Sequence, residues 1–162
     1  MQGKIRLTLG MGLLAALALA PPQSAHADPR GLGLGVMVGE PTGVTGKVWL
    51  DDTNAFDFAI GSFGYYADSP YSGVNVHADY LWHHYGIFGD PGSQAYTRLP
   101  IYVGVGGMMA SPGVAGVRGV LGITWLFRQP FDLFFELAPT LVIAPGLGFG
   151  LDAGLGGRFY FF

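Results

Sequence analysis

The sequence predicts an all-β protein, an eight-stranded antiparallel up-and-down transmembrane β-barrel. The chain is apolar, with 50% hydrophobic, 14% aromatic and 12% charged residues, whereas a typical soluble domain has about 25% charged residues. After residue 27 there is no apolar run long enough for a spanning helix, and hydrophobic residues alternate with small or polar ones. Without such helices, an apolar chain can satisfy its backbone in lipid only by closing a sheet into a barrel.

The first 27 residues have the three parts of a secretory signal peptide. Lys4 and Arg6 precede an apolar run over residues 7–20, and the small-residue sequence Ala25-His26-Ala27 follows two prolines. A basic start, a short apolar centre and an A-x-A end are typical of a cleaved export signal. The alternative is a transmembrane anchor, but this run is shorter than the ~20 apolar residues that span a bilayer. We expect a signal peptide over 1–27, cleavage after Ala27, and the barrel over 28–162.

Charge and cysteine content exclude several classes of protein. Removing residues 1–27 takes away two of the eight Lys and Arg residues and none of the eleven Asp and Glu residues, so the formal charge becomes 6 − 11 = −5. No nucleic-acid partner is expected, because nucleic-acid binding requires a basic surface. The absence of cysteine excludes disulfides, thiolate metal sites and a lipidated N-terminal cysteine. Membrane attachment must therefore come from the fold itself.

The period-two pattern divides the chain into eight strands separated by turn-like segments. The strands are expected at 33–39, 43–50, 55–63, 74–84, 99–107, 117–127, 132–143 and 148–162. Eight is the smallest common strand number of outer-membrane barrels. If the first strand starts in the periplasm, the turns near 52–54, 85–98 and 128–131 are periplasmic. The connections near 40–42, 64–73, 108–116 and 144–147 are then extracellular.

The second and third strands show how the alternation assigns faces. One face carries Val44, Val48, Leu50, Phe56, Phe58 and Ile60, and the other carries Thr45, Lys47, Trp49, Asp57 and Ala59. A turn centred on Thr53 would set Val48 opposite Phe58 and Trp49 opposite Asp57. A one-residue slip would place Asp57 on the apolar face, so the pattern specifies the register.

The sixth and seventh strands repeat the pattern and indicate which face meets lipid. Leu121, Ile123, Trp125 and Phe127 are expected to face Leu133, Phe135 and Leu137, with Arg118, Thr124, Phe134, Glu136 and Thr140 on the other side. Most strand charges share a face with small residues, which suit a narrow lumen. Membrane barrels carry aromatic girdles near strand ends, where Trp82, Trp125, Phe127, Tyr160 and Phe161 lie. The inverted alternative, a secreted lipocalin-like barrel, would leave too little polar surface for solubility.

The end of the chain, Gly157-Arg158-Phe159-Tyr160-Phe161-Phe162, resembles the aromatic terminal strand by which outer-membrane barrels are recognised. We therefore expect two partners, the barrel-assembly machinery and outer-membrane lipid. Alternation counted from Phe162 would point Arg158 at lipid, at a cost of ~2–4 kcal/mol near the midplane. Alternation counted from Phe161 turns Arg158 inward and is preferred, with Phe162 as an overhang.

Eight ionisable side chains are expected to face the lumen, and they form the candidate site. They are Lys47, Asp57, His77, Asp79, Arg118, Glu136, Asp152 and Arg158. The expected register places Glu136 diagonally near Arg158, and Lys47 one strand away from Asp57. Buried charges must be paired to be tolerated, and side chains just fill an eight-stranded lumen. A structural network of salt bridges is therefore favoured over an ion path.

Histidines on the fourth strand suggest a metal site or a hydrolase, and we favour neither. His77, Asp79 and His83 share one face, but six residues of strand, ~20 Å, separate the two histidines, so one metal ion cannot bind both. His77 and Asp79 could imitate a nucleophile–base–acid set with Ser69 or Ser72, although no motif supports it. We expect no catalytic residue, no metal and no cofactor.

Two glycine patterns resemble nucleotide-binding motifs only superficially. Residues 39–47 have the outline of a phosphate-binding loop, but Pro41 stands at the required glycine and Val48 replaces the Ser or Thr. Gly31, Gly33 and Gly35 recur without a following helix. Glycines at period two in strands are expected instead to relieve crowding in a narrow barrel.

Several segments taken together resemble a family of small, mostly uncharacterised outer-membrane β-barrel proteins of diderm bacteria, with an OmpA- or OmpX-like barrel. These segments are GEPTG at 39–43, KVWL at 47–50, NAFD at 54–57, LPIYVGVGG at 99–107, GVRGVLG at 116–122, FELAP at 135–139 and the closing Gly-Arg-aromatic run. The resemblance implies a membrane barrel of the same kind. It implies no established activity, so no functional residues are carried over.

The sequence thus predicts a non-enzymatic integral protein of the outer membrane of a diderm bacterium, with a surface or structural role in the envelope. One alternative is a lipid-modifying hydrolase that depends on His77. Another is a narrow channel whose conductance depends on Lys47 or Glu136. An interaction protein would bind through the loop at 64–73.

Overall fold

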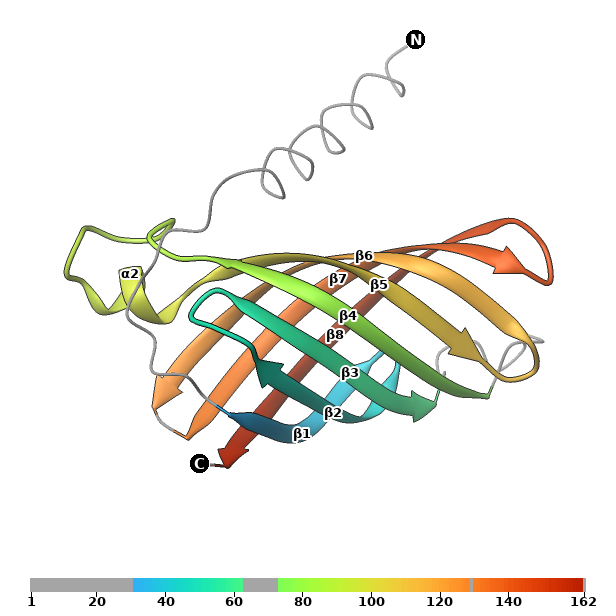
Figure 1. Ribbon diagram of the computed structural model, residues 1–162, viewed down its shortest axis with the longest axis horizontal. Coiled ribbons are helices and arrows are strands. Elements are labelled where there is room, and N and C mark those ends of the chain that lie inside the picture. The colour runs from blue at the N-terminus through green and yellow to red at the C-terminus, as the bar shows by residue number, and fades with distance from the viewer. Residues whose placement is uncertain (1–30, 63–72, 129, 162) are drawn as a thin grey trace, which may run out of the picture.

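The computed structural model describes residues 31–62, 73–128 and 130–161, which form one closed antiparallel barrel (Figure 1). The strands are β1 (Leu32–Gly39), β2 (Thr42–Trp49), β3 (Asn54–Ser62), β4 (Val74–His84), β5 (Ile101–Ala110), β6 (Val114–Arg128), β7 (Phe131–Ala144) and β8 (Gly148–Phe161). Each strand pairs with its neighbours in the chain, and β1 pairs with β8. The predicted fold class, an eight-stranded antiparallel barrel, is confirmed. The predicted signal peptide lies outside the described residues.

Every predicted strand is present, and the largest differences from prediction lie around the β5–β6 turn. We expected a connection over 108–116, but it is only the turn 111–113, in which Gly113 adopts a positive φ of 73°. The strands extend further because Met108, Ala110 and Val114 pack together in the lumen. Burial of these side chains stabilises the longer strands, which the sequence pattern did not predict.

The segment between β4 and β5 contains a short helix, α2 (Gln94–Arg98), where the sequence predicted only a connection. Ser93 caps it, since the Ser93 hydroxyl accepts a hydrogen bond from the backbone N–H of Tyr96 at 3.2 Å. Nowhere in the described part of the chain is a helix long and apolar enough to cross a membrane. The helix, the β2–β3 turn and the end of β8 lie at one end of the barrel, called here the α2 end (Figure 1). The opposite end, called the proline end, has turns containing Pro41, Pro112 and Pro145.

The predicted register of β2 and β3 is wrong by two residues. Val48 lies opposite Phe56, not Phe58, and Lys47, not Trp49, lies opposite Asp57. The turn is centred one residue earlier than expected, and in it the Asp51 carboxylate accepts hydrogen bonds from the backbone N–H groups of Thr53 and Asn54, both at 2.8 Å. A shift by an even number keeps each residue on its predicted face.

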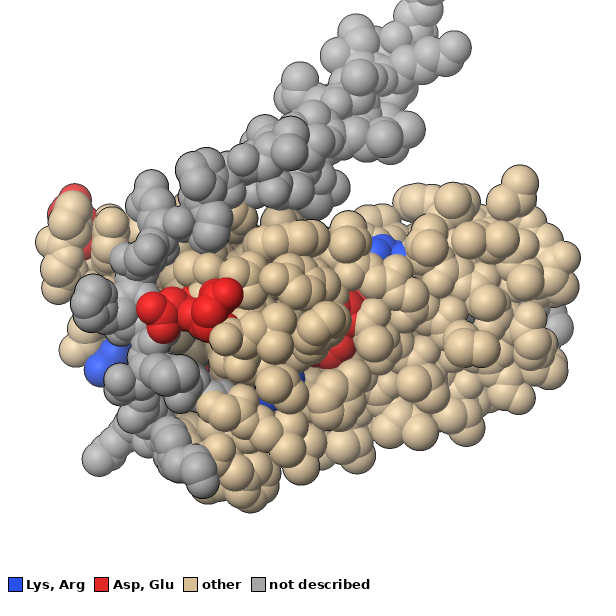
Figure 2. Space-filling model, viewed as in Figure 1, with Lys and Arg blue, Asp and Glu red and all other residues tan. Residues whose placement is uncertain are grey.

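Large apolar side chains cover the outside of every strand. Examples with 40% exposure or more are Leu32, Val44, Phe58, Val76, Val105, Val117, Phe135 and Leu155. In the view of Figure 2 the strand surface is almost free of charged side chains, and acidic residues gather toward the α2 end. The predicted pairing of apolar residues between β6 and β7 is confirmed, with Leu121 opposite Leu137, Ile123 opposite Phe135 and Trp125 opposite Leu133.

The aromatic girdle prediction is wrong for one residue. Tyr160 points into the lumen and is fully buried, whereas Phe161, Trp125 and Trp82 are exposed or half-exposed. Nearness to a strand end suggested a membrane-facing ring, but the alternation along β8 turns Tyr160 inward. The preferred phase of this strand is confirmed, because Phe161 is exposed and Arg158 is 2% exposed. The side chain of Phe127 and residue Phe162 lie outside the described residues.

Inward-facing glycines make room for aromatic rings in the lumen. A Cβ atom on Gly33 would stand 2.6 Å from the Tyr160 ring, and one on Gly156 would stand 2.5 Å from the Phe134 ring. Such contacts are too close for real side chains, so each ring requires a glycine beside it. The prediction that strand glycines relieve crowding is confirmed.

Candidate functional site

The eight ionisable residues predicted to face the lumen are all buried inside the barrel, each with 9% exposure or less. They are Lys47, Asp57, His77, Asp79, Arg118, Glu136, Asp152 and Arg158. These side chains are called here the lumen charges. The largest fully buried side chains of the described chain, among them Tyr102, Tyr160 and Phe134, lie inside with them. The lumen therefore combines charged groups with aromatic packing.

Arg118 on β6 links carboxylates from two other strands. Its Nε atom lies 3.2 Å from Oδ2 of Asp79 on β4, and its Nη2 atom donates to Oε1 of Glu136 on β7 at 3.1 Å. The Tyr102 hydroxyl on β5 donates to the other Glu136 oxygen at 3.2 Å. This cluster spans the four consecutive strands β4 to β7 and gives the buried guanidinium two counter-charges.

The predicted proximity of Glu136 to Arg158 is wrong. The β7–β8 ladder sets Arg158 opposite Asp132 and Glu136 opposite Gly154, so Glu136 lies four residues along the ladder from Arg158. Glu136 instead binds Arg118. The prediction failed because alternation defines the face of a strand but leaves its register free by steps of two.

Arg158 reaches across the lumen instead of pairing along its own hairpin. Its guanidinium binds the Asp57 carboxylate on β3 and donates to the Thr45 hydroxyl on β2 at 3.0 and 3.3 Å. The guanidinium carbon lies 3.7 Å above the centre of the Phe134 ring, a cation–π geometry. Its path crosses β1, where Arg158 lies opposite Gly35, and no side chain blocks it there.

Lys47 and Asp57 are direct partners in the β2–β3 ladder, but the lysine ammonium turns away from the carboxylate. Lys47 Nζ lies 2.7 Å from Nε2 of His83, and Nδ1 of His83 lies 3.1 Å from the backbone oxygen of Thr53. A carbonyl can only accept, so Nδ1 carries the proton and Nε2 accepts from the ammonium. The Trp49 ring also faces the ammonium, with its centre at 4.4 Å.

Sequence reasoning missed several members of the lumen site. The Asp132 carboxylate is 1% exposed and accepts a hydrogen bond from the Tyr160 hydroxyl at 2.6 Å. Asp132 lies two and four residues before Phe134 and Glu136 and so shares their face of the strand, and its inward position could have been predicted from the alternation. It was left out because it is the first residue of its predicted strand. His83 was assigned the right face but was not included among the lumen charges.

Near the proline end, the lumen holds polar atoms without a protein partner. These buried atoms are Nδ1 of His77, Oδ1 of Asp79, Nη1 of Arg118 and both side-chain polar atoms of Asn75. Asp152, in the same region, accepts from the Thr140 hydroxyl at 3.1 Å. Donors and acceptors are mixed, a combination that water can satisfy.

The hydrolase and metal-site alternatives both involve residues of β4. His77 Nε2 lies 3.8 Å from Oδ2 of Asp79, beyond hydrogen-bond distance. Ser69 and Ser72, the loop serines of the hydrolase alternative, lie outside the described residues. Within the described ranges, no three His, Asp or Glu side chains come together in a way that could hold a metal ion.

Comparison with known proteins supports the fold. Neither a family model nor a curated protein sequence matches the chain. A solved structure with a similar fold is the N-terminal β-barrel domain of OprF from Pseudomonas aeruginosa, with a TM-score of 0.57 and 18% sequence identity. The alignment covers 82% of this chain and 98% of that one. The barrel implied by the family resemblance is therefore confirmed at the level of fold.

Proposed function

We propose that the chain is a non-enzymatic integral β-barrel of the outer membrane of a diderm bacterium. Its role is in the structure or surface of the envelope, and its lumen charges hold the wall together and do not conduct ions. The observation that carries this proposal is the inverted distribution of side chains. Large apolar residues lie outside on all eight strands, and the charged side chains that the structure describes on the strands lie inside.

The exposures of individual residues support a lipid environment for the outer face. Val36, Val105 and Leu155 are 66%, 57% and 55% exposed, whereas Lys47, Arg118 and Arg158 are 2% exposed or less. Soluble monomers rarely expose contiguous apolar patches above a few hundred Å². The predicted export signal and the fold shared with the OprF barrel domain agree with this location.

The contacts in the lumen favour a structural role over conduction. Arg118 and Arg158 each bind carboxylates from other strands, and Tyr102 and Phe134 pack beside them. A mobile ion would have to displace these pairs in a lumen that eight strands leave just wide enough for side chains. We therefore assign the network the role of joining the strands across the lumen.

The test is heat modifiability of the protein in the outer-membrane fraction, comparing gel migration with and without boiling in detergent. The expected result is a compact, faster band before boiling, because the closed barrel resists detergent. A protein recovered from the periplasm with identical migration in both lanes would overturn the proposal. Single-channel conductance in planar bilayers that changes in Lys47→Met would instead indicate a channel, and loss of lipid hydrolysis in His77→Ala would indicate an enzyme.

A further inference from the structure

Five buried polar atoms on the inner face of the barrel have no hydrogen-bond partner among the described residues. They are both side-chain polar atoms of Asn75, Nδ1 of His77, Oδ1 of Asp79 and Nη1 of Arg118. Asn75 is 0% exposed, and the other three residues are each 2% exposed. A buried polar group without a hydrogen bond costs free energy, so such a concentration of them indicates a bound molecule that supplies their partners.

The four residues form one continuous group. Asn75, His77 and Asp79 alternate along the inner face of β4, where residues two apart are separated by roughly 7 Å. His77 Nε2 lies 3.8 Å from Oδ2 of Asp79, and Nε of Arg118 lies 3.2 Å from the same oxygen. The group therefore runs from Arg118 to Asn75, the second residue of β4 at the proline end. This part of the lumen is called here the proline half.

The positions beside Asn75 and His77 in the sheet carry small or apolar residues. They are Gly61 and Ala110 beside Asn75, and Ala59 and Met108 beside His77. None of these residues has a side-chain N–H, O–H or oxygen to offer. The glycine and the alanines also fill little space, so a small polar molecule fits beside the two polar side chains.

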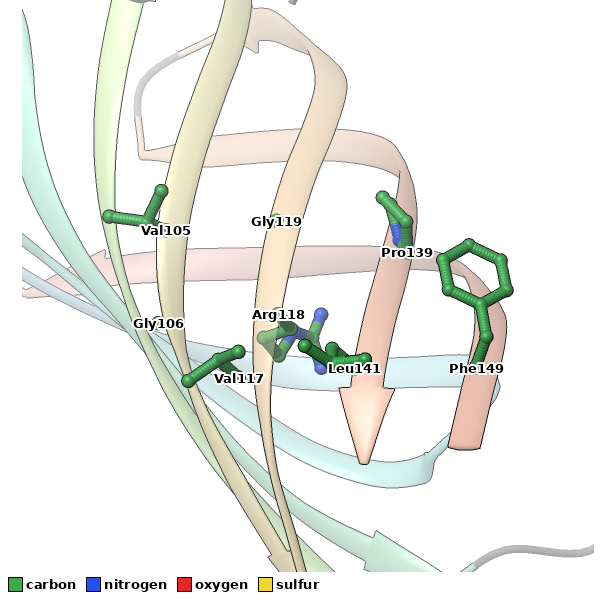
Figure 3. Close-up of a pocket in the computed structure, with 8 residues that line it drawn as sticks. All are labelled: Val105, Gly106, Val117, Arg118, Gly119, Pro139, Leu141 and Phe149. Atoms are coloured by element: carbon green, nitrogen blue, oxygen red, sulfur yellow. The ribbon is translucent and has the colours of Figure 1, made fainter. Parts of the chain in front are cut away.

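The proline half has an inner boundary at Arg118. Gly106 on β5 lies opposite both Asp79 and Arg118, and Figure 3 shows Gly106 and Arg118 on neighbouring strands. A Cβ atom on Gly106 would overlap Oδ1 of Asp79, so this oxygen uses the space that the glycine leaves. Beyond Arg118 the lumen is closed by an apolar cluster of four buried residues, Leu81, Tyr102, Val120 and Ala138.

We propose that the proline half of the lumen binds a cluster of ordered water molecules, which joins Arg118 and Asp79 to His77 and Asn75. The unpartnered atoms include two donors, Nη1 of Arg118 and Nδ2 of Asn75, and two acceptors, Oδ1 of Asp79 and Oδ1 of Asn75. Water both donates and accepts, as this mixture requires. Because one buried water makes about three hydrogen bonds, the five atoms need about two molecules.

An ion fits the same atoms less well than water. A cation would meet the oxygens but would leave the N–H groups of Arg118 and Asn75 without acceptors. In the part of the chain that the structure describes, no three His, Asp or Glu side chains are placed to hold a metal ion. An anion would have to lie beside the Asp79 carboxylate. The water site lies inside the closed barrel, so this inference goes beyond the proposed envelope role and does not depend on it.

The experiment is an NMR measurement of cross-relaxation between water and the side-chain NH₂ protons of Asn75, on the full protein folded in detergent micelles. Asn75 is 0% exposed, so bulk water does not contact these protons. We expect a cross peak with the sign of a long-lived complex. The backbone amide of Val120, in the apolar cluster, is the internal control and should show none. Thr140 lies opposite Arg118 and has an exchangeable hydroxyl proton, so the Asn75 peak must persist in Thr140→Val.

Two variants fill the space beside the polar side chains, Ala110→Leu next to Asn75 and Ala59→Val next to His77. Both should weaken the Asn75 cross peak roughly tenfold, because the filled space no longer holds water. The matched control is Ala78→Leu, an exposed position on β4 that faces away from the lumen, and it should leave the peak unchanged.

Absence of the Asn75 cross peak in the original protein would overturn the inference, and so would a peak of undiminished intensity in a folded filling variant. The compact band before boiling shows which samples are folded. An original protein without that band would refute the proposed function, whereas a folded barrel without the cross peak would refute only the water site.

Discussion

Arg158 on β8 and Asp57 on β3 form an ion pair that crosses two intervening strands of the barrel. Neither side chain forms its ion pair with the oppositely charged residue across from it on the neighbouring strand, which is Asp132 for Arg158 and Lys47 for Asp57. The connection ties the last strand to the first half of the chain. It therefore acts on the closure of the barrel and not on one hairpin alone.

Replacing Arg158 by leucine should destabilise the barrel by about 3–5 kcal/mol, because it leaves the Asp57 carboxylate buried without a cation. Urea unfolding in detergent micelles measures the change. In the double variant Arg158→Leu with Asp57→Leu, part of the loss should be recovered, since no uncompensated charge remains. Strictly additive losses in the two single variants would contradict the pairing.

Arg118 should not be replaceable by lysine without cost. The guanidinium reaches Asp79 and Glu136 through different nitrogens, 3.2 and 3.1 Å from the carboxylate oxygens, and a single ammonium lacks that fork geometry. We expect Arg118→Met to lower the temperature at which the compact band disappears, and Arg118→Lys to give an intermediate temperature. If Arg118→Lys matched the original protein, only one of the two contacts would matter for stability.

A methyl group should be tolerated very differently at two glycines. A Cβ atom on Gly35 would overlap the backbone oxygen of Gly157 across the β1–β8 pairing, whereas one on Gly119 meets only an ordinary contact. Gly35→Ala is expected to reduce the yield of folded barrel severalfold, and Gly119→Ala to leave it unchanged. The compact band in refolding assays reports the yield. Equal yields of the two variants would show that the β1–β8 pairing can shift to accommodate the methyl group.

A charge on the outer face should cost more in the middle of a strand than at a turn. Phe135 lies within β7 and is 44% exposed, whereas Leu147 lies in the β7–β8 turn and is 84% exposed. In a bilayer, Phe135→Arg should cost ~2–4 kcal/mol and Leu147→Arg ~0–1 kcal/mol. Denaturant titration in vesicles gives both values. Equal small costs would indicate that this face does not meet lipid.

The β2–β3 turn should weaken in acid because of Asp51. Burial of the Asp51 carboxyl acts to raise its pKa, but the hydrogen bonds from Asn54 and Thr53 outweigh it and hold the pKa below the usual value. A lowered pKa in the folded state means that the contribution to stability is present above the unfolded pKa, ~3.9, and is lost as the pH falls. Because Asp51 is exposed, the effect is small and screened by salt.

Amide hydrogen exchange at Thr53 and Asn54 measures this contribution. Exchange at these amides should become faster in Asp51→Asn at neutral pH, with little further change on acidification. Asp52→Asn is the matched control. It removes the same charge, but the turn amides of Thr53 and Asn54 donate their hydrogen bonds to Asp51. If exchange became faster in both variants, the change in net charge, and not the loss of the turn hydrogen bonds, would be its cause.

The faces of the strands could be predicted from sequence, whereas their registers could be predicted only in part: the β6–β7 pairing was predicted correctly and two others were not. Alternation distinguishes inside from outside because adjacent residues point to opposite faces, and this placed Lys47, Arg118 and Glu136 in the lumen. A shift of two residues leaves every face unchanged, so the β2–β3 and β7–β8 registers were each misplaced. Hydrogen bonding in the turns, as at Asp51, decides between such registers.

Contacts across the lumen lie beyond pattern analysis altogether. The pairing of Arg158 with Asp57 joins strands that are not neighbours, and it depends on the glycines of β1 leaving the path open. Tyr160 was misplaced because an aromatic residue near a strand end suits either a membrane girdle or a lumen with a hydrogen-bond partner. The hydrogen bond from Tyr160 to Asp132 on the neighbouring strand β7 favours the lumen position, and this contact follows from the β7–β8 register, which alternation leaves open.

The pairing of β1 with β8, which closes the barrel, also affects the order in which the barrel can assemble. It joins the first strand to be synthesised to the last, and Asp57 receives its cation from a residue 101 positions later in the chain. Until β8 arrives, β1 and β7 would each present an edge of unpaired backbone groups. Lipid does not tolerate such edges, so for a barrel in the proposed membrane location we expect insertion to follow synthesis as one event, or to take place on a surface that covers both open edges.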